Sequence, residues 1–468
     1  MSQTASRAAA KVQGRGAALC LCAGLFLLYC SNLRTIYTGD TVATRFLPFS
    51  LLLDHTLNVD RWVGPYLFPP GSPNNYFVTC AHGHWMSSYP ILTPLVVTPL
   101  YVIPSLYLAR RPGPIPARTA QTISQGMEKL SAALLAALSA GILFLALRKI
   151  AAPGAALAIA VVYGAASSTW SIASQALWTH PLAEVSFALL LWALVGLPGK
   201  PRAAFWAGLG LAMAVADKPP NAVFALPVVI YFFLYHRDKL AMFLAPPAVL
   251  GALVLSYNLH YFGGVFGAYS AAFRTMGYSS VANGFRGSLW RGMAGFLASP
   301  SRSIFVFMPW TVFSIWGAVR LWRDTRIPWG RYLIAGAIGL FLVYSKLERW
   351  WGGWTFGPRY LTDLLPVLAF FLAPIWPEIR RRRWLRGAFV VAVAAAIWVQ
   401  VVGAYYFPSG DWNTTPVSVD EHPERVWDWP DTELARTWHA GPAPSHLTER
   451  WRGLEHWLER GKASPGPG

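Results

Sequence analysis

The sequence predicts an all-α polytopic membrane protein, and three features of it carry that prediction. The 468 residues are 54% hydrophobic and only 13% charged, whereas a soluble domain carries roughly 25% charged residues. Apolar runs of membrane-spanning length recur along the chain. The basic residues fall in short clusters between these runs, as in the cytoplasmic loops of membrane proteins. Lipid must therefore be the solvent for much of this chain.

Twelve apolar runs approach the roughly 20 residues that cross a bilayer as a helix. They lie near residues 16–36, 89–108, 120–147, 152–170, 181–198, 203–217, 220–235, 240–257, 303–321, 330–346, 359–377 and 385–407. The basic run from Arg380 to Arg383 fixes a cytoplasmic end. We count the crossings backward from this cytoplasmic end and place the basic N-terminus in the cytoplasm as well. The loop of residues 37–121 must then begin and end on the external side of the membrane.

One run within this first external loop therefore does not cross. We choose 89–108, because its four prolines interrupt a helix, and interpret it as a juxtamembrane or re-entrant segment. The alternative is that it crosses and leaves Arg110 and Arg111 inside. The predicted result is about 11 transmembrane helices with the N-terminus in the cytoplasm.

Two domains follow from this layout. Residues 1–407 form the transmembrane domain, whose first external loop, 37–121, carries juxtamembrane helices. Residues 408–468 form a polar external tail, partly disordered, with an amphipathic helix near 445–461. The long loops are external, so the external face is expected to be the functional one. The basic residues behind the net charge of +18 lie in the loops. They do not form the continuous basic surface that binding of nucleic acid requires.

Asp40 directly follows the first predicted span. A carboxylate where a helix leaves lipid is costly unless it is used or paired, so Asp40 is a candidate general base or metal ligand. The alternative is an ordinary acidic residue at a helix end. A second external cluster contains Gln175, Trp178 and His180, and it is alternatively explained as an interfacial belt of aromatic residues.

Three cations are candidate anion ligands. Arg302 follows Ser299 and Ser301 before a predicted helix, where a helix N-terminus and an arginine can bind phosphate; an ordinary capped helix is the alternative. Lys218 lies at the tip of the hairpin formed by residues 203–235. Arg359 begins a late span and can hold a phosphate.

The segment before Arg359 is rich in tryptophan. Trp351 and Trp354 flank a glycine pair, and their flat faces suit stacking on a sugar ring or lying at the headgroup layer. Asp363 lies four residues after Arg359, so the alternative for both is that they pair with each other along a helix.

These motifs resemble those of the GT-C superfamily of integral membrane glycosyltransferases, in particular the group of protein O-mannosyltransferases and aminoarabinose transferases. The residues that carry the resemblance are Thr38–Thr41, Gln175–His180, Asp217–Pro220 and Gly357–Leu361. The resemblance implies transfer of a sugar from a polyprenyl-phosphate carrier to a glycan, lipid or protein acceptor. It also implies a bacterial inner (plasma) membrane protein whose active site faces outward.

By this resemblance Asp40 is the catalytic base, and Lys218, Arg302 and Arg359 bind the phosphate of the lipid carrier. The candidates for sugar or acceptor binding are Gln175, Trp178, His180, Trp351 and Trp354. Members of the superfamily often carry an acidic pair in the first loop, but Gly39 precedes Asp40 here. A second acid would have to come from Asp54, Asp60 or Glu128, so no cofactor is assigned and a divalent metal is left open.

Two other functions are considered. A transporter or flippase for a lipid-linked sugar would place charges near the bilayer midplane and show paired repeats, whereas the charged candidates here lie at span ends without an internal repeat. A non-catalytic scaffold or receptor would not need these charged residues on one side of the membrane. The sequence has no Walker loop, dinucleotide-binding glycine pattern or HExxH helix.

Overall fold

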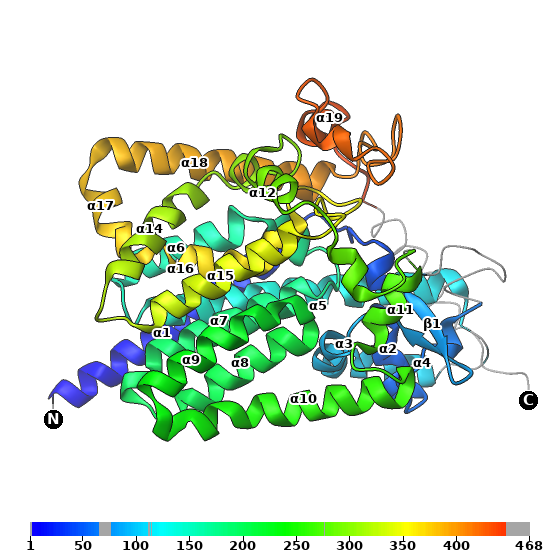
Figure 1. Ribbon diagram of the computed structural model, residues 1–468, viewed down its shortest axis with the longest axis horizontal. Helices are drawn as coiled ribbons and strands as arrows, with labels where there is room; N and C mark the ends of the chain where they lie inside the picture. Colours follow the sequence, from blue (N-terminus) through cyan, green and yellow to red (C-terminus); the bar gives the residue numbers. More distant parts are fainter. Residues whose placement is uncertain (1, 65–75, 111–112, 114, 276, 446–468) are drawn as a thin grey trace, which may run out of the picture.

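A computed structural model of the chain describes residues 2–64, 76–110, 113, 115–275 and 277–445. Long helices run side by side, and Figure 1 shows α5 (Ala117–Leu147), α8 (Ala203–Asp217), α10 (Leu240–Phe262) and α15 (Trp329–Ser345) extending along the long axis of the molecule. Helix is also the dominant structure elsewhere in the described chain. The prediction of an apolar, predominantly helical polytopic protein is confirmed at this level.

Six helical segments of the described residues are long and apolar enough to cross a membrane. These are Leu92–Ala109, Ala117–Leu147, His180–Gly199, Arg237–Phe262, Arg359–Arg381 and Arg383–Tyr406. Five shorter apolar helices accompany them: Gly14–Cys30, Pro153–Ala165, Ala203–Asp217, Pro219–Tyr235 and Trp329–Ser345. The number of crossings and their orientation stay predictions.

The helix pairs pack closely because glycine lets their backbones meet. In α8, a Cβ at Gly208 would lie 1.9 Å from the carbonyl oxygen of Phe243 in α10. A Cβ at Gly210 would lie 2.7 Å from the carbonyl oxygen of Ser186 in α7 (His180–Gly196). These contacts hold α7, α8 and α10 at a fixed spacing, and α7 packs on α5 on its other side.

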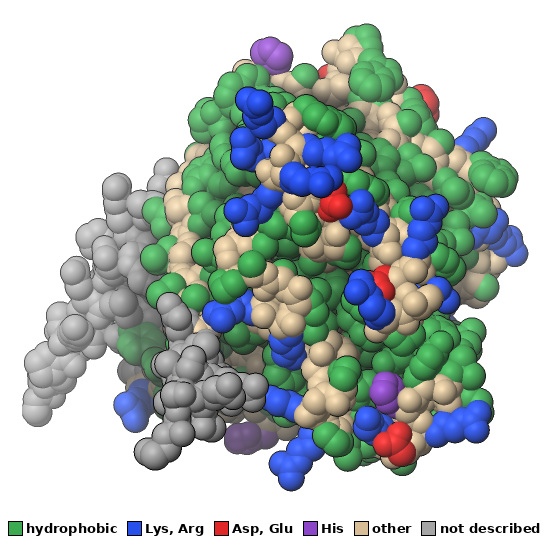
Figure 2. All heavy atoms as spheres, turned by 90° about the vertical axis from the view of Figure 1, so that its left-hand side faces the viewer, with side chains coloured by type: hydrophobic (Ala, Val, Ile, Leu, Met, Phe, Trp, Pro, Cys, Tyr) green, Lys and Arg blue, Asp and Glu red, His purple; other side chains and the backbone are tan. Residues whose placement is uncertain are grey.

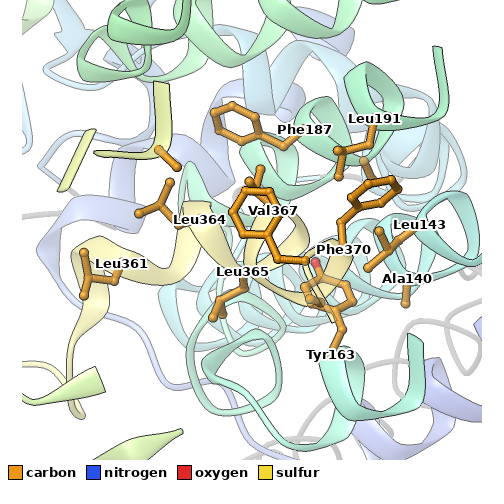
Figure 3. Packing of buried hydrophobic residues seen from close by; sticks show 14 of the residues in the cluster. Ala140, Leu143, Tyr163, Phe187, Leu191, Leu361, Leu364, Leu365, Val367 and Phe370 are labelled. Atoms are coloured by element: carbon orange, nitrogen blue, oxygen red, sulfur yellow. The ribbon is translucent and has the colours of Figure 1, made fainter. Parts of the chain in front are cut away.

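The segment after Arg359 inserts into this core. It comprises the 3-10 helix η8 (Arg359–Leu364) and α16 (Leu365–Phe370). Figure 3 shows the side chains of α16 among those of α5, α6 (Pro153–Ala165) and α7. Leu365 is fully buried and Phe370 almost so. Burial of these apolar side chains fixes the position of the polar residues at the start of η8.

One end of the helix bundle carries many basic side chains. Figure 2 shows Lys and Arg side chains spread over the end that lies on the left in Figure 1. Basic residues there come from the last turn of α14 (Thr311–Arg323), from η6 (Arg237–Lys239), and from the last turn of α17 (Trp376–Arg381). The first loop lies at the opposite end, where Figure 1 places α2 (Gly39–Leu53), α3 (Leu92–Val97), α4 (Val102–Ala109) and β1 (Val78–Ala81).

The first loop folds into a small structure of its own. It contains α2 (Gly39–Leu53), η1 (Asp60–Trp62) and an antiparallel hairpin of β1 (Val78–Ala81) and β2 (His84–Ser87), in which Val78 pairs with Ser87. The sequence did not predict this hairpin, and it is the correction to an all-α fold. The strands are only four residues long, so period-two alternation hardly develops in them.

The proline-rich run 89–108 forms α3 (Leu92–Val97), η2 (Thr98–Tyr101) and α4 (Val102–Ala109). Its segments pack against α2. The Asp217 carboxylate at the end of α8 accepts hydrogen bonds from the Thr93 backbone nitrogen (3.2 Å) and hydroxyl (2.6 Å). These contacts favour a segment docked on the protein, and its juxtamembrane placement stays a prediction. Arg111, invoked in the alternative, lies outside the described residues.

Two predicted spans differ in extent from the observed helices. The run 16–36 is helical only to Cys30, where α1 (Ser2–Cys30) ends. The run 303–321 is divided into α13 (Ile304–Phe307) and α14, with Pro309 between them. Proline removes a backbone donor and disfavours helix before it, which explains the break.

Further helices of the described chain are α9 (Ala225–Tyr235), α11 (Gly267–Thr275), η7 (Val281–Phe285), α12 (Leu289–Ala298), α18 (Arg383–Val401), η11 (Pro423–Trp427) and α19 (Glu433–His439). The helix α9 leads directly into η6 at the basic end, and α18 begins directly after α17, whereas Figure 1 places α11 beside the elements of the first loop. The helix α19 belongs to the tail, which packs as a compact cap and buries Glu433 and Val426. The amphipathic helix predicted near 445–461 lies outside the described residues, apart from its first position.

Candidate active site

A cavity of about 1570 Å³ opens at the end of the bundle that carries the first loop. Its wall is built from segments that lie far apart in the sequence. They include the start of α2, the start of α7, the residues that follow α8, the helix α11, the loop before η8, and the tail. Of the candidate residues, the structure brings Asp40, Trp178, His180, Lys218, Trp354 and Arg359 to this wall.

Asp40 lies in the first turn of α2, where the helix dipole stabilises a carboxylate. Its Oδ1 accepts a hydrogen bond from the Tyr89 hydroxyl at 2.7 Å. Its Oδ2 accepts one from the Arg359 guanidinium at 2.8 Å. The side chain of Asp40 is 17% exposed. It is therefore an acceptor that two donors hold in place and that is still reachable from the cavity.

Tyr76 explains why a glycine precedes Asp40. A Cβ at Gly39 would lie 2.3 Å from the Tyr76 hydroxyl oxygen, so a side chain at that position would displace the phenol ring. Burial, with a smaller contribution from the negative charge of Asp40, raises the pKa of Tyr76. The phenol thus stays protonated beside the carboxylate, in the space where a second acidic residue would have to fit.

Arg359 opens η8 and is the second partner of the site. Its guanidinium lies over the ring of Trp178, 4.9 Å from the centroid, which orients it by a cation–π contact. One terminal nitrogen holds Asp40, while the buried Nε has no hydrogen-bond partner among the described residues. The side chain is 13% exposed and lines the cavity, so a guanidinium whose donors are not all paired is suited to bind an anion there.

Lys218 joins a second buried cluster beside this pair. Its ammonium lies 2.8 Å from Asp363 Oδ2, and His180 Nδ1 lies 2.6 Å from Asp363 Oδ1. The Tyr344 hydroxyl donates to the same carboxylate at 3.0 Å. The sequence had offered Asp363 only as a helical partner of Arg359. That pairing is wrong, because Arg359 binds Asp40 and Asp363 binds His180 and Lys218.

Residues that the sequence analysis missed complete the wall. Tyr76 and Tyr89 come from the first loop, and Arg349 precedes the tryptophan-rich segment. Arg349 is exposed and lines the cavity as a further cation. A basic residue three positions before a glycine pair carries no recognisable signal, and tyrosines in a long loop carry none either.

Arg302 does not line the cavity, which corrects its assignment as a phosphate ligand. It is fully buried, and its guanidinium binds Glu433 at 2.5 Å, Asn413 Oδ1 at 2.8 Å and the Trp351 carbonyl at 2.9 Å. The Ser301 carbonyl at 2.7 Å and the Gly353 carbonyl at 3.3 Å accept two further hydrogen bonds from the guanidinium, so none of its five donors is left for a substrate anion. Its helix, α13, has only four residues, so the expected helix N-terminal site does not form.

Gln175 and Trp351 are also structural. The Gln175 side-chain oxygen accepts from Asn32 Nδ2 at 2.7 Å and from Lys129 Nζ at 2.6 Å, and the side chain is fully buried. Trp351 donates its indole N–H to Asp420 at 2.7 Å and is nearly buried. Neither residue lines the cavity.

The candidate second acids are engaged elsewhere. Asp54 pairs with Arg61, Asp60 with His84, and Glu128 with Arg45. The described residues contain no group of three or more His, Cys, Asp or Glu side chains that could hold a metal ion. Asp40 itself has a hydroxyl and a guanidinium on its two oxygens. This donor set does not fit a divalent metal.

Comparison with solved structures gives three matches, each 12% identical. ArnT from Cupriavidus metallidurans bound to undecaprenyl phosphate has a TM-score of 0.48, with 93% of this chain and 75% of that chain covered. An oligosaccharyltransferase of Archaeoglobus fulgidus tethered with an acceptor peptide gives 0.46, with 88% and 59% covered. AglB of the same organism, in complex with an inhibitory peptide and a dolichol-phosphate, gives 0.49, with 91% and 61% covered.

The chain thus spans about three fifths of the length of the two archaeal structures. All three TM-scores lie below 0.5. No protein-family model matches the sequence, and no curated protein matches it either.

Proposed function

We propose that this protein is a membrane glycosyltransferase that moves a sugar from a polyprenyl-phosphate carrier to an acceptor on the non-cytoplasmic face. The observation that carries the proposal is the contact between Asp40 and Arg359. A carboxylate acceptor and a cation with an unpaired donor share one cavity wall. Transfer of a sugar from a phosphate carrier requires the carboxylate to take the proton and the cation to stabilise the leaving phosphate.

In the proposed reaction Asp40 is the general base. Its carboxylate takes the proton of an acceptor hydroxyl while the hydroxyl oxygen attacks the anomeric carbon of the donor sugar. The bond from that carbon to the carrier phosphate oxygen breaks, and the polyprenyl phosphate leaves with the electron pair. Attack from the face opposite the phosphate inverts the anomeric configuration.

The leaving phosphate is assigned to Arg359, Lys218 and Arg349. Charge-assisted hydrogen bonds from a guanidinium stabilise phosphate oxygens in a site of low dielectric. The Asp363 carboxylate positions Lys218 and His180 beside the cavity. Trp178 supports Arg359 from the other side, and His180 Nε2 is left to contact the sugar.

An apolar part of the cavity wall suits the isoprenoid chain. Phe266, Tyr269, Phe273 and Phe285 come from α11 and the segments on either side of it, and Leu347 faces the cavity from the end of α15. Phe266 remains 58% exposed. A polyprenyl chain would bury such surface with a gain of roughly 25 cal/mol per Å².

The outward orientation is also part of the proposal. Basic residues occupy the end of the bundle opposite the first loop (Figure 2), and such clusters stay in the cytoplasm. The cavity would then open to the periplasmic side of a bacterial inner membrane.

One experiment separates this proposal from a flippase. Purified protein in liposomes is supplied with radiolabelled polyprenyl-phosphate sugars and mixed acceptors, and both labelled product and labelled carrier in each leaflet are measured. The proposal expects label to leave the carrier and enter an acceptor. Movement of intact labelled carrier between leaflets without transfer would overturn it.

A further inference from the structure

The tail forms one wall of the cavity. Pro408, Asp411, Thr414 and Asp420 line it together with Trp354 of the loop before η8. This wall is polar, whereas the wall near α11 is apolar and the wall at α2 carries Asp40. The cavity thus has a third part with a chemistry of its own, which the proposed transfer reaction leaves unassigned.

This wall is held rigidly against the bundle. Glu433 of α19 binds Arg302, accepts a hydrogen bond from Asn413 Nδ2 at 3.0 Å, and accepts another from the Gly357 backbone nitrogen at 2.8 Å. Trp412 donates to the carbonyl of Asp431 at 2.7 Å. The tail is therefore built into the site, and the Gly357 bond links it to the segment that ends in Arg359.

Trp354 supplies a flat apolar face on this wall. Its side chain is 51% exposed, and its indole N–H reaches Ser418 of the tail at 3.3 Å. Trp178, the support of Arg359, lines a second small pocket together with Trp354. The tryptophan face therefore lies next to the reacting centre, within reach of a group bound there.

Two aspartates, Asp411 and Asp420, line the same cavity as this ring. Asp411 is exposed, and no side-chain bond to its carboxylate occurs among the described residues. Asp411 has a left-handed backbone conformation with φ of 45°. L-residues seldom adopt this conformation unless the surrounding structure holds them in it. Asp420 uses one oxygen for Trp351 Nε1, at 2.7 Å. Ionised carboxylates are pure acceptors, so these residues select a ligand rich in donors.

We infer that Trp354, Asp411 and Asp420 form the acceptor subsite and that the acceptor is a saccharide, neutral or amine-bearing. A sugar ring offers an apolar face for the indole and hydroxyl donors for the carboxylates. A lipid acceptor would need an apolar wall, and two carboxylates disfavour an acidic glycan. This inference rests on the proposed function and gives the class of its acceptor.

The test uses the full chain in lipid nanodiscs on two arrays. One carries defined neutral, amine-bearing and acidic oligosaccharides, and the other carries serine- and threonine-containing peptides. The variants are Trp354→Ala, Trp354→Phe and Asp411→Asn. Matched controls are Trp429→Ala and Glu421→Gln, which change exposed tail residues outside the cavity lining.

The expected result is binding to a neutral or amine-bearing saccharide that weakens about tenfold in Trp354→Ala and Asp411→Asn. Trp354→Phe keeps an aromatic face and should retain most of the affinity, and the controls should match the wild type. Peptide binding in place of saccharide binding would overturn the inference. So would equal saccharide affinity in Trp354→Ala, Asp411→Asn and the wild type.

Carrier binding is measured on the same preparations with vesicles containing polyprenyl phosphate. The three subsite variants should bind these vesicles as the wild type does, which also shows that they are folded. If the wild-type protein binds a saccharide through Trp354 but neither binds the carrier nor transfers sugar, the proposed function alone is wrong. A saccharide array without any binding would end the inference while leaving carrier-dependent transfer intact.

Discussion

Asp40 and Arg359 lie 319 positions apart in the sequence and meet in a 2.8 Å ion pair at the cavity wall. One residue lies in the first turn of α2, and the other opens η8. Their side chains are 17% and 13% exposed, so the pair is shielded without being closed off. In the proposed reaction the contact joins the proton acceptor to a ligand of the leaving phosphate.

Replacing Arg359 by lysine should weaken binding of polyprenyl phosphate. A lysine ammonium lacks the planar fork of donors, so it cannot hold Asp40 and a phosphate at the same time. We expect a loss of about tenfold in carrier affinity, measured by vesicle binding, and a larger loss in transfer rate. Arg320→Lys is the matched control, because Arg320 pairs with Glu378 away from the cavity. Equal losses in both variants would contradict the assignment.

Asp363→Asn should destabilise the protein because it leaves Lys218 buried without a charge partner. Breaking a buried pair on one side typically costs about 3–5 kcal/mol. The expected readout is a lower midpoint of thermal unfolding in detergent. The double variant Asp363→Asn with Lys218→Met should recover much of that stability but still bind the carrier poorly. Normal carrier binding by the double variant would remove Lys218 from the phosphate site.

Arg302 offers the opposite test, since the structure assigns it to the tail. Arg302→Met alone should leave Glu433 buried and unpaired, and should expose the tail to limited proteolysis. Adding Glu433→Met should restore protection, and this double variant should bind polyprenyl phosphate like the wild type. Loss of carrier binding despite a protected tail would return Arg302 to the phosphate site.

Carrier binding should weaken at high pH through Lys218. Burial lowers the pKa of Lys218, although the Asp363 carboxylate opposes that change. The ammonium therefore loses its proton at a lower pH than an exposed lysine would, and phosphate binding falls as pH rises through that pKa. In Lys218→Arg the side chain keeps its charge, so the alkaline limb of the binding profile, where binding falls, should move to higher pH. An unchanged limb would show that Lys218 does not set it.

The alternative that Arg359 and Asp363 pair with each other is wrong because of the kind of helix that holds them. Residues four apart face each other on an α-helix, and the sequence therefore allowed these two to pair. They lie instead in a 3-10 helix, η8, where positions three apart are aligned. Their side chains diverge, so Arg359 reaches Asp40 and Asp363 reaches Lys218. Local propensity does not reveal this tighter helix, because its geometry is set by how α16 inserts into the core.

Long-range pairing accounts for the other errors. Arg302 is bound by Glu433, 131 residues later, and Gln175 by Lys129, 46 residues earlier. Nothing in the local sequence distinguishes an arginine that will be paired from one that will face a cavity. Asp40 was identifiable because a carboxylate at a span end is costly. Hydropathy likewise predicted most of the apolar helices, whereas the β1–β2 hairpin was too short to detect.

The most direct test of the central claim is sugar transfer by Asp40→Asn. Membranes containing equal amounts of wild-type or variant protein receive radiolabelled polyprenyl-phosphate sugars and acceptors, with Asp54→Asn as a matched control. We expect Asp40→Asn to lose about 100-fold or more in transfer rate while it still binds the carrier, because only the base is removed. Transfer at the wild-type rate in Asp40→Asn would contradict the account.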